Sequence, residues 1–153
     1  MHIRFVASLL CLAAAAYACG PRPHADPAAT AATVRTRMPN EPKLASSLDV
    51  AVDKGVTFAL HVTNTTDRKI ELNFASGQTH DFAVLDASGR EVWRWSAGRM
   101  FTQALQNRLV SSRATMTYEE TWQPEDARGS FTAVGTLRSD NYPIETRVEF
   151  TLP

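Results

Sequence analysis

The fold class of this chain follows from one stretch, Leu48-Asp49-Val50-Ala51-Val52-Asp53-Lys54-Gly55-Val56-Thr57-Phe58-Ala59-Leu60-His61-Val62-Thr63. On both sides of Asp53-Lys54-Gly55, large apolar residues take every second position. Successive side chains of a β-strand point to opposite faces, so this pattern predicts two strands with one buried face each. The short Asp-Lys-Gly sequence is typical of a tight turn. We therefore expect an antiparallel hairpin.

The same alternation continues outward through the rest of the chain. It predicts further strands at residues 70–74, 82–84, 92–95, 116–122, 131–137 and 148–152, and Asp86-Ala87-Ser88-Gly89 is a further hairpin turn. Strands with one apolar face are accommodated most simply by two antiparallel sheets packed face to face. The stretch Asp126-Ala127-Arg128-Gly129-Ser130-Phe131 looks like the corner that precedes a late strand of immunoglobulin domains, although Phe131 could act there only by packing. The prediction is all-β: an immunoglobulin-like antiparallel β-sandwich of seven to eight strands.

The N-terminal segment differs in character from the rest of the chain. Residues 1–18 are interpreted as a signal peptide, with a positive charge at Arg4, an apolar run over residues 5–16 and small residues before Cys19. That run is too short to span a bilayer as a permanent helix. A cysteine at the mature N-terminus is what a bacterial lipoprotein needs for lipidation, so Cys19 is the predicted lipidation site. The alternative is ordinary signal peptidase cleavage and free secretion.

The remaining chain divides into a tether and one domain. Residues 19–43 are predicted to be a disordered tether, because they are rich in Ala, Pro and Thr and have few large apolar residues to bury. Residues 44–153 are enough for one domain. They contain 11 basic and 14 acidic residues, a formal net charge of −3, which argues against nucleic acid as a partner. If Cys19 is acylated, the domain would be anchored in the cell envelope, facing the periplasm or the exterior.

A set of residues in the middle of the domain goes beyond simple alternation. It consists of Ser76-Gly77-Gln78, Asp81-Phe82, Trp93-Arg94-Trp95-Ser96, and Phe101 with Gln103. This set resembles the signature of the BsuPI family of proteinase inhibitor-like domains. The resemblance implies an immunoglobulin-like sandwich and, for the founding member, inhibition of a bacterial serine proteinase. Similar sequences have Leu-x-Pro-Gly-Glu where this chain has Leu109-Val110-Ser111-Ser112-Arg113, so we expect a looser turn here.

The alternation breaks between Ser96 and Ala114. A connection of about eighteen residues is long for a compact domain, which favours a functional loop. Its residues Arg99, Met100 and Phe101 suit proteinase specificity pockets and are the predicted contact tip. The alternative is that residues 101–105 form a further strand or turn that closes one end of the sandwich, with Phe101 and Leu105 buried.

Trp93 and Trp95 fall on the same face of their predicted strand. Inside the sandwich, each ring would bury a large apolar area. Outside it, the two rings would form an aromatic platform for a partner. Because exposed tryptophan on a strand is a liability, we expect at least one of them in the core.

The sequence predicts no enzyme and no cofactor. Ser76, His80 and Asp81 include the elements of nucleophilic hydrolysis, but adjacent His80 and Asp81 point to opposite faces of a strand and cannot orient one another. Asp81 is instead expected to accept hydrogen bonds from backbone N–H groups of the Ser76-Gly77-Gln78 turn. A zinc site needs three or four close ligands, and residues 44–153 offer only His61 and His80 besides carboxylates.

Two functions remain open from the sequence. The first is an exported inhibitor of serine proteinases that acts through the loop after Ser96, with a protease as its partner. The second is a non-enzymatic lipoprotein of the cell envelope that serves as a protein-binding or assembly module. The second rests on Cys19 and on the frequent reuse of sandwiches for binding.

Overall fold

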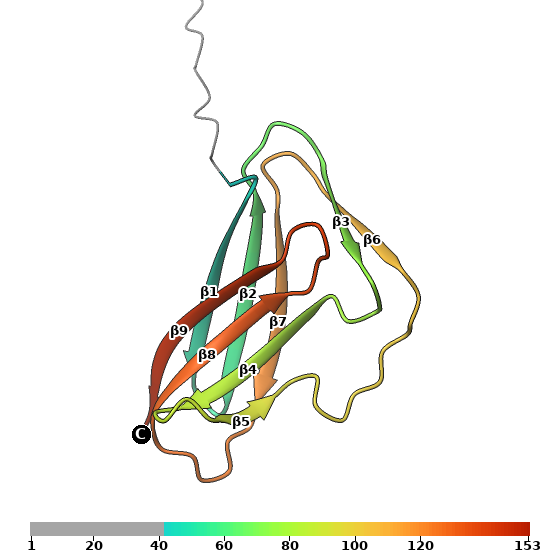
Figure 1. Cartoon of the computed structure of the whole chain (residues 1–153). Coiled ribbons are helices and arrows are strands. Elements are labelled where there is room, and N and C mark those ends of the chain that lie inside the picture. The colour runs from blue at the N-terminus through green and yellow to red at the C-terminus, as the bar shows by residue number, and fades with distance from the viewer. Residues whose placement is uncertain (1–41) are drawn as a thin grey trace, which may run out of the picture. The chain divides into compact units, whose positions relative to one another are not determined.

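The computed structural model describes residues 42–153, and the predicted signal peptide, most of the tether and Cys19 lie outside these residues. The described chain contains nine β-strands (Figure 1), and it has no helix that could cross a membrane. The strands are β1 (Leu44–Val52), β2 (Val56–Asn64), β3 (Ile70–Phe74), β4 (His80–Asp86), β5 (Glu91–Arg94), β6 (Gln106–Val110), β7 (Thr115–Trp122), β8 (Gly129–Leu137) and β9 (Ile144–Leu152). The all-β prediction is confirmed, with one strand more than expected.

Two larger sheets form the body of the domain. One has the order β1-β2-β7 and the other β5-β4-β8-β9, and every pair of neighbouring strands is antiparallel. The fully buried Phe58 of β2 lies 5.8 Å from the ring of Phe82 on β4 and 6.1 Å from that of Phe150 on β9. The sheets therefore pack face to face, as Figure 1 shows where β9, β8 and β4 cross β1, β2 and β7. The immunoglobulin-like topology stays a prediction.

Both predicted hairpins are present. Val52 pairs with Val56, and the backbone N–H of Asp53 donates to the Gly55 carbonyl (3.0 Å). In the β4–β5 turn, Gly89 has a φ of +82°, which only glycine adopts easily. The Asp86 carboxylate accepts hydrogen bonds from Ser88 and Arg90, and these hold the pKa of Asp86 well below its ordinary value. Local turn chemistry thus agrees with the strand pattern.

Phe131 contributes to the corner before β8 by packing, as the sequence predicted. Gly129 begins β8 with a φ of +95°, and two residues later Phe131 is buried. Its ring lies 5.9 Å from that of Trp122 in an edge-on arrangement and 5.8 Å from that of Phe150. The corner is therefore fixed by aromatic contacts between β7, β8 and β9.

A small third sheet pairs β3 with β6. The apolar residues of β3 are buried as predicted, but β6 lies inside the segment that was expected to be structureless. Only Val110 of β6 is buried, so this strand carries no alternating apolar pattern that sequence could reveal. Backbone pairing with β3 creates it instead. The connection that remains is the β5–β6 loop, residues 95–105.

Asn64 holds together the turns next to this small sheet. Its side chain is fully buried, and its amide nitrogen donates to three backbone carbonyls, those of Arg68 (2.7 Å), Val110 (3.1 Å) and Ser111 (2.9 Å). Its Oδ1 accepts from the backbone N–H (2.9 Å) and the hydroxyl (2.8 Å) of Thr66. The looser β6–β7 turn stays a prediction; in this turn the carbonyls of Val110 and Ser111 accept from Asn64, and Arg113 adopts the left-handed φ of +58°.

Candidate functional site: the β5–β6 loop and its anchors

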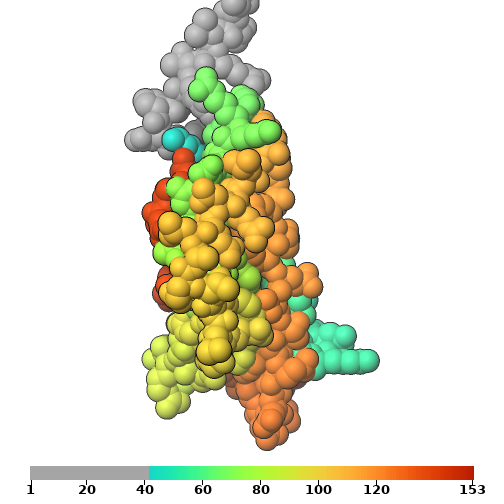
Figure 2. All heavy atoms as spheres, turned by 90° about the vertical axis from the view of Figure 1, so that its right-hand side faces the viewer, coloured from blue at the N-terminus to red at the C-terminus, as the bar shows by residue number. Residues whose placement is uncertain are grey.

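The β5–β6 loop and the adjoining β6 carry the most exposed large apolar side chains among residues 42–153. Met100 is 97% exposed, Leu105 is 81% exposed, and Leu109 on β6 is 64% exposed. Figure 2 shows this part of the chain, in yellow to orange, as a band that runs down the face turned to the viewer. Apolar side chains gathered on one exposed segment are typical of a contact surface.

The first anchor of the loop is the buried carboxylate of Asp81 on β4. Its side chain is 3% exposed. It accepts hydrogen bonds from the backbone N–H (3.2 Å) and the hydroxyl (2.8 Å) of Ser96, and forms an ion pair with Arg94 (2.8 Å). Hydrogen bonds from Arg94 to Glu91 and to Asp81 raise the pKa of the guanidinium. Asp81 thus fixes the first residues of the loop to β4.

The predicted role of Asp81 was wrong. It makes no bond to the Ser76-Gly77-Gln78 turn, where the Ser76 hydroxyl itself accepts from the Gln78 N–H (3.2 Å). The reason is the pairing of β4 with β5, which places Arg94 opposite Ala83. Asp81 and Ala83 share one face of β4, so β5 rather than the preceding turn lies within reach of the carboxylate.

The second anchor is the Trp95 ring. The guanidinium carbon of Arg99 lies 4.6 Å from the centroid of this ring, and Arg99 Nε donates to the Trp95 carbonyl (2.8 Å). The Phe101 ring lies 5.6 Å from the Trp95 ring. Trp93 and Trp95 are both partly buried and packed against the core. Trp93 stacks at 5.6 Å on the central Phe58, whereas Trp95 also contacts Arg99 and Phe101 and so supports the loop.

His80 joins this anchor to the opposite sheet. Its ring stacks on Trp95 at 4.4 Å and lies 4.6 Å from the Tyr118 ring of β7. Its Nε2 is 3.4 Å from a carboxylate oxygen of Glu120, also on β7. Burial lowers the pKa of His80 despite the opposing effect of Glu120. As expected from the sequence, His80 and Asp81 point to opposite faces of β4.

The third anchor is a close approach between Gly77 and Thr102. The Gly77 N–H donates to the Thr102 carbonyl (2.8 Å). A Cβ atom at position 77 would lie 2.7 Å from Thr102 Oγ1, so a larger residue would push the loop away. Gly98, with a φ of +71°, allows the tight bend between the first two anchors. The loop is thus fixed at both ends.

These anchors separate the three residues of the predicted contact tip. Met100 projects from the loop, while Arg99 and Phe101 turn back onto Trp95. The alternative with a buried Leu105 is wrong, because this side chain is exposed. The exposed Gln103 donates to the Phe101 carbonyl (3.3 Å). Sequence reasoning that placed Leu105 in the core missed it as a surface residue, since only the packing of the neighbouring strands decides which leucines stay outside.

Several residues of the family signature described above hold this loop in place. They are Gly77, Asp81, Trp95, Ser96 and Phe101. A family model matches residues 44–142. The chain belongs to the BsuPI family. That family is described as an intracellular proteinase inhibitor. The residues matched by the BsuPI family model include the whole β5–β6 loop. A search of curated proteins found no match to the sequence.

Two solved structures show a distant likeness to this BsuPI chain. One is the β-glucosidase EmGH1 from Erythrobacter marinus, with 14% identity and a TM-score of 0.36 over 71% of this chain and 16% of that one. The other is a Bordetella pertussis protein designated ApaA, with 17% identity and a TM-score of 0.38 over 71% of this chain and 89% of that one. This BsuPI chain thus spans only a small part of the β-glucosidase.

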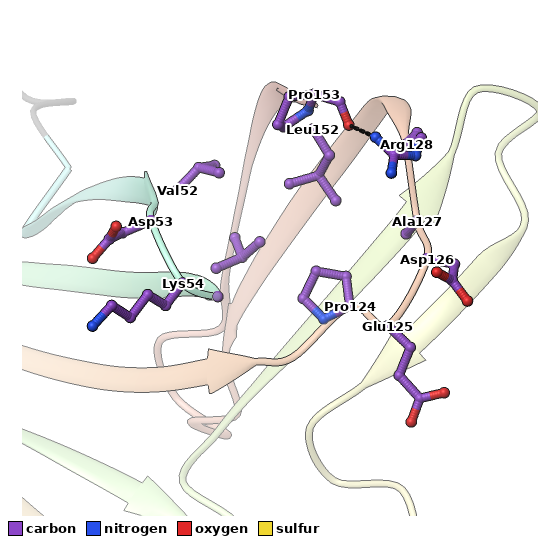
Figure 3. A pocket seen from close by; sticks show the side chains of 12 residues that line it. Val52, Asp53, Lys54, Pro124, Glu125, Asp126, Ala127, Arg128, Leu152 and Pro153 are labelled. Atoms are coloured by element: carbon purple, nitrogen blue, oxygen red, sulfur yellow. Dashed lines mark hydrogen bonds between the residues drawn. The ribbon is translucent and has the colours of Figure 1, made fainter.

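A hollow at one end of the BsuPI domain is another candidate site (Figure 3). It is lined by the β1–β2 turn, the β7–β8 connection and the C-terminal residues. Its charged side chains are mixed in sign, with Lys54 and Arg128 near Asp53, Glu125 and Asp126. Arg128 is engaged with the Pro153 carbonyl (3.0 Å). This mixture favours no class of ligand, so the loop is the stronger site.

Proposed function

We propose that this protein is an exported inhibitor of serine proteinases that acts through the β5–β6 loop. The observation that carries the proposal is the exposure of Met100 and Leu105 on a loop that is fixed at both ends. The family membership supplies the class of partner, since the BsuPI family is described as a proteinase inhibitor.

The three anchors favour tight binding, because a loop that is already ordered loses little conformational entropy when it binds a proteinase. Proteinase–inhibitor interfaces bury about 800 Å² per partner, and only the surplus over the entropy of ordering appears as affinity. Here Asp81 holds Ser96, Trp95 holds Arg99 and Phe101, and Gly77 holds Thr102. The loop is therefore ordered in the free protein.

The purified protein should inhibit a subtilisin-like proteinase at near-stoichiometric concentration. Leu105→Asp should weaken this inhibition at least about tenfold, because a charge replaces an apolar contact in the interface. Val52→Asp is the matched control: Val52 is also exposed, at 43%, but lies at the β1–β2 hairpin. Titration of residual proteinase activity measures both. Equal inhibition by the two variants, or none by the wild type across a panel of serine proteinases, would refute the proposal.

Export is supported by the character of residues 1–18 and by Cys19, whereas the family description says intracellular. If Cys19 is acylated, radiolabelled fatty acid should be incorporated into the wild type and lost in Cys19→Ser. Cys11→Ser is the matched control and should keep the label, because Cys11 lies in the segment removed on processing. Unlabelled, full-length protein in the cytoplasmic fraction would contradict export, and unlabelled mature protein outside the cell would indicate free secretion.

A further inference from the structure

The side chains of Met100 and of its two neighbours, Arg99 and Phe101, point in different directions. Their directions indicate which of them would enter the specificity pocket of a proteinase. Met100 is 97% exposed. The Arg99 guanidinium lies over the Trp95 ring at 4.6 Å, and its Nε donates to the Trp95 carbonyl at 2.8 Å. The Phe101 ring packs on the same tryptophan at 5.6 Å. Arg99 is exposed as well, but its guanidinium lies on the Trp95 ring, so of the three side chains Met100 gives up the least contact when it enters a pocket of another molecule.

We infer that the partner is a proteinase whose primary specificity pocket takes a large, unbranched apolar side chain, and that Met100 fills this pocket. The inference rests on the proposed inhibitory function and adds the class of partner. Methionine is flexible, polarizable and uncharged, so it adapts to narrow apolar pockets. An exposed side chain of this kind gains free energy when a partner removes it from water.

A proteinase of the trypsin type is a poor partner by the same argument. Its pocket ends in a carboxylate that pairs with a basic side chain, and Met100 would cover this carboxylate without pairing with it. Arg99 is the adjacent basic residue, but its guanidinium is engaged by the ring and the carbonyl of Trp95. An unpaired buried charge excludes a partner more strongly than a missing apolar contact does.

Two further exposed apolar side chains follow Met100 in the chain. Leu105, at the end of the β5–β6 loop, is 81% exposed, and Leu109 on β6 is 64% exposed. Their side chains offer apolar contacts to the walls of the proteinase cleft outside the primary pocket. The partner's cleft should therefore be apolar over a length greater than one pocket.

The test compares inhibition constants of the purified protein against a subtilisin-like proteinase and against trypsin in one buffer. The wild type should inhibit the first at least about 100-fold more strongly. Met100→Leu should keep that inhibition within about threefold, while Met100→Asp should weaken it at least about tenfold. Met100→Lys should weaken inhibition of the subtilisin-like enzyme and strengthen inhibition of trypsin, because lysine can pair with the pocket carboxylate.

The outcomes separate this inference from the proposed function. Inhibition of the subtilisin-like enzyme that is unchanged in Met100→Asp, or wild-type inhibition of trypsin of equal strength, would overturn the inference and leave the proposed function standing. If the wild type inhibits neither enzyme, the proposed function fails and the inference fails with it. Because Met100 is exposed, the three variants should unfold at the wild-type temperature, which separates lost contact from lost fold.

Discussion

Asn64→Ala should lower the free energy of unfolding by about 3–5 kcal/mol, because each buried polar group left without a partner costs about 1–3 kcal/mol. The substitution takes the Asn64 side chain away from the carbonyls of Val110 and Ser111 and from the Thr66 N–H, while the Arg68 carbonyl keeps the Thr66 hydroxyl as a donor (2.9 Å). These groups belong to the turns that hold β3 and β6 beside the sandwich. Equilibrium denaturation with urea measures the change as a shift of the midpoint at constant slope.

Two further variants make this test specific. Asn64→Asp keeps the size and the acceptor but replaces the donating amide with a second oxygen that faces three carbonyl oxygens, so it should be about as damaging as alanine. Asn107→Ala is the matched control, because Asn107 is exposed and makes one side-chain bond, to Glu71 at 3.3 Å. It should change stability by less than about 0.5 kcal/mol. Equal stability of Asn64→Ala and Asn107→Ala would contradict the role assigned to Asn64.

Asp81→Ala should destabilise the domain by about 2–4 kcal/mol, because hydrogen bonds to charged groups contribute about 1.5–3 kcal/mol each and are not additive. The variant leaves the backbone N–H groups of Phe82 and Ser96 without the carboxylate that they share. It also frees the start of the β5–β6 loop. We therefore expect faster amide hydrogen exchange at Ser96 together with weaker proteinase inhibition.

Glu91→Ala provides the comparison for Asp81→Ala, since both carboxylates pair with Arg94. The side chain of Glu91 is 41% exposed and that of Asp81 is 3% exposed. Exposed ion pairs contribute about 0–1 kcal/mol, so the loss of Glu91 should have little effect on stability or on the loop. If the two variants unfolded at the same denaturant concentration, burial of Asp81 would not be the source of its effect.

Much of the fold could be predicted because it depends on local patterns. The alternation over residues 56–62 and 70–74 correctly assigns the buried faces of β2 and β3, and the glycine of the β4–β5 turn was placed correctly. The strand β6 could not be predicted, because its residues Gln106–Val110 have a single buried member. Its strand conformation comes from hydrogen bonding to β3, which is distant in sequence.

The candidate site, like the fold, could be predicted only in part from the sequence. The sequence pointed to Arg99, Met100 and Phe101 as a group, because long side chains outside the alternation indicate an exposed loop. It could not tell which of them projects, since the directions of Arg99 and Phe101 depend on the position of the Trp95 ring. The leucine at position 105 was placed wrongly in one alternative for a similar reason: no neighbouring residue indicates whether the core lies beneath it.

The amino-acid sequence by itself determined that this chain forms antiparallel sheets, and which side of most strands faces inward, because side-chain alternation is a property of the extended backbone itself. It also carried the residues by which the BsuPI family is known. Only the tertiary structure decided that Asp81 holds Ser96, that Gly77 meets Thr102 and that Met100 remains outside. Each of these contacts joins segments whose distance depends on how the sheets pair and pack, and that arrangement exists only in the folded domain.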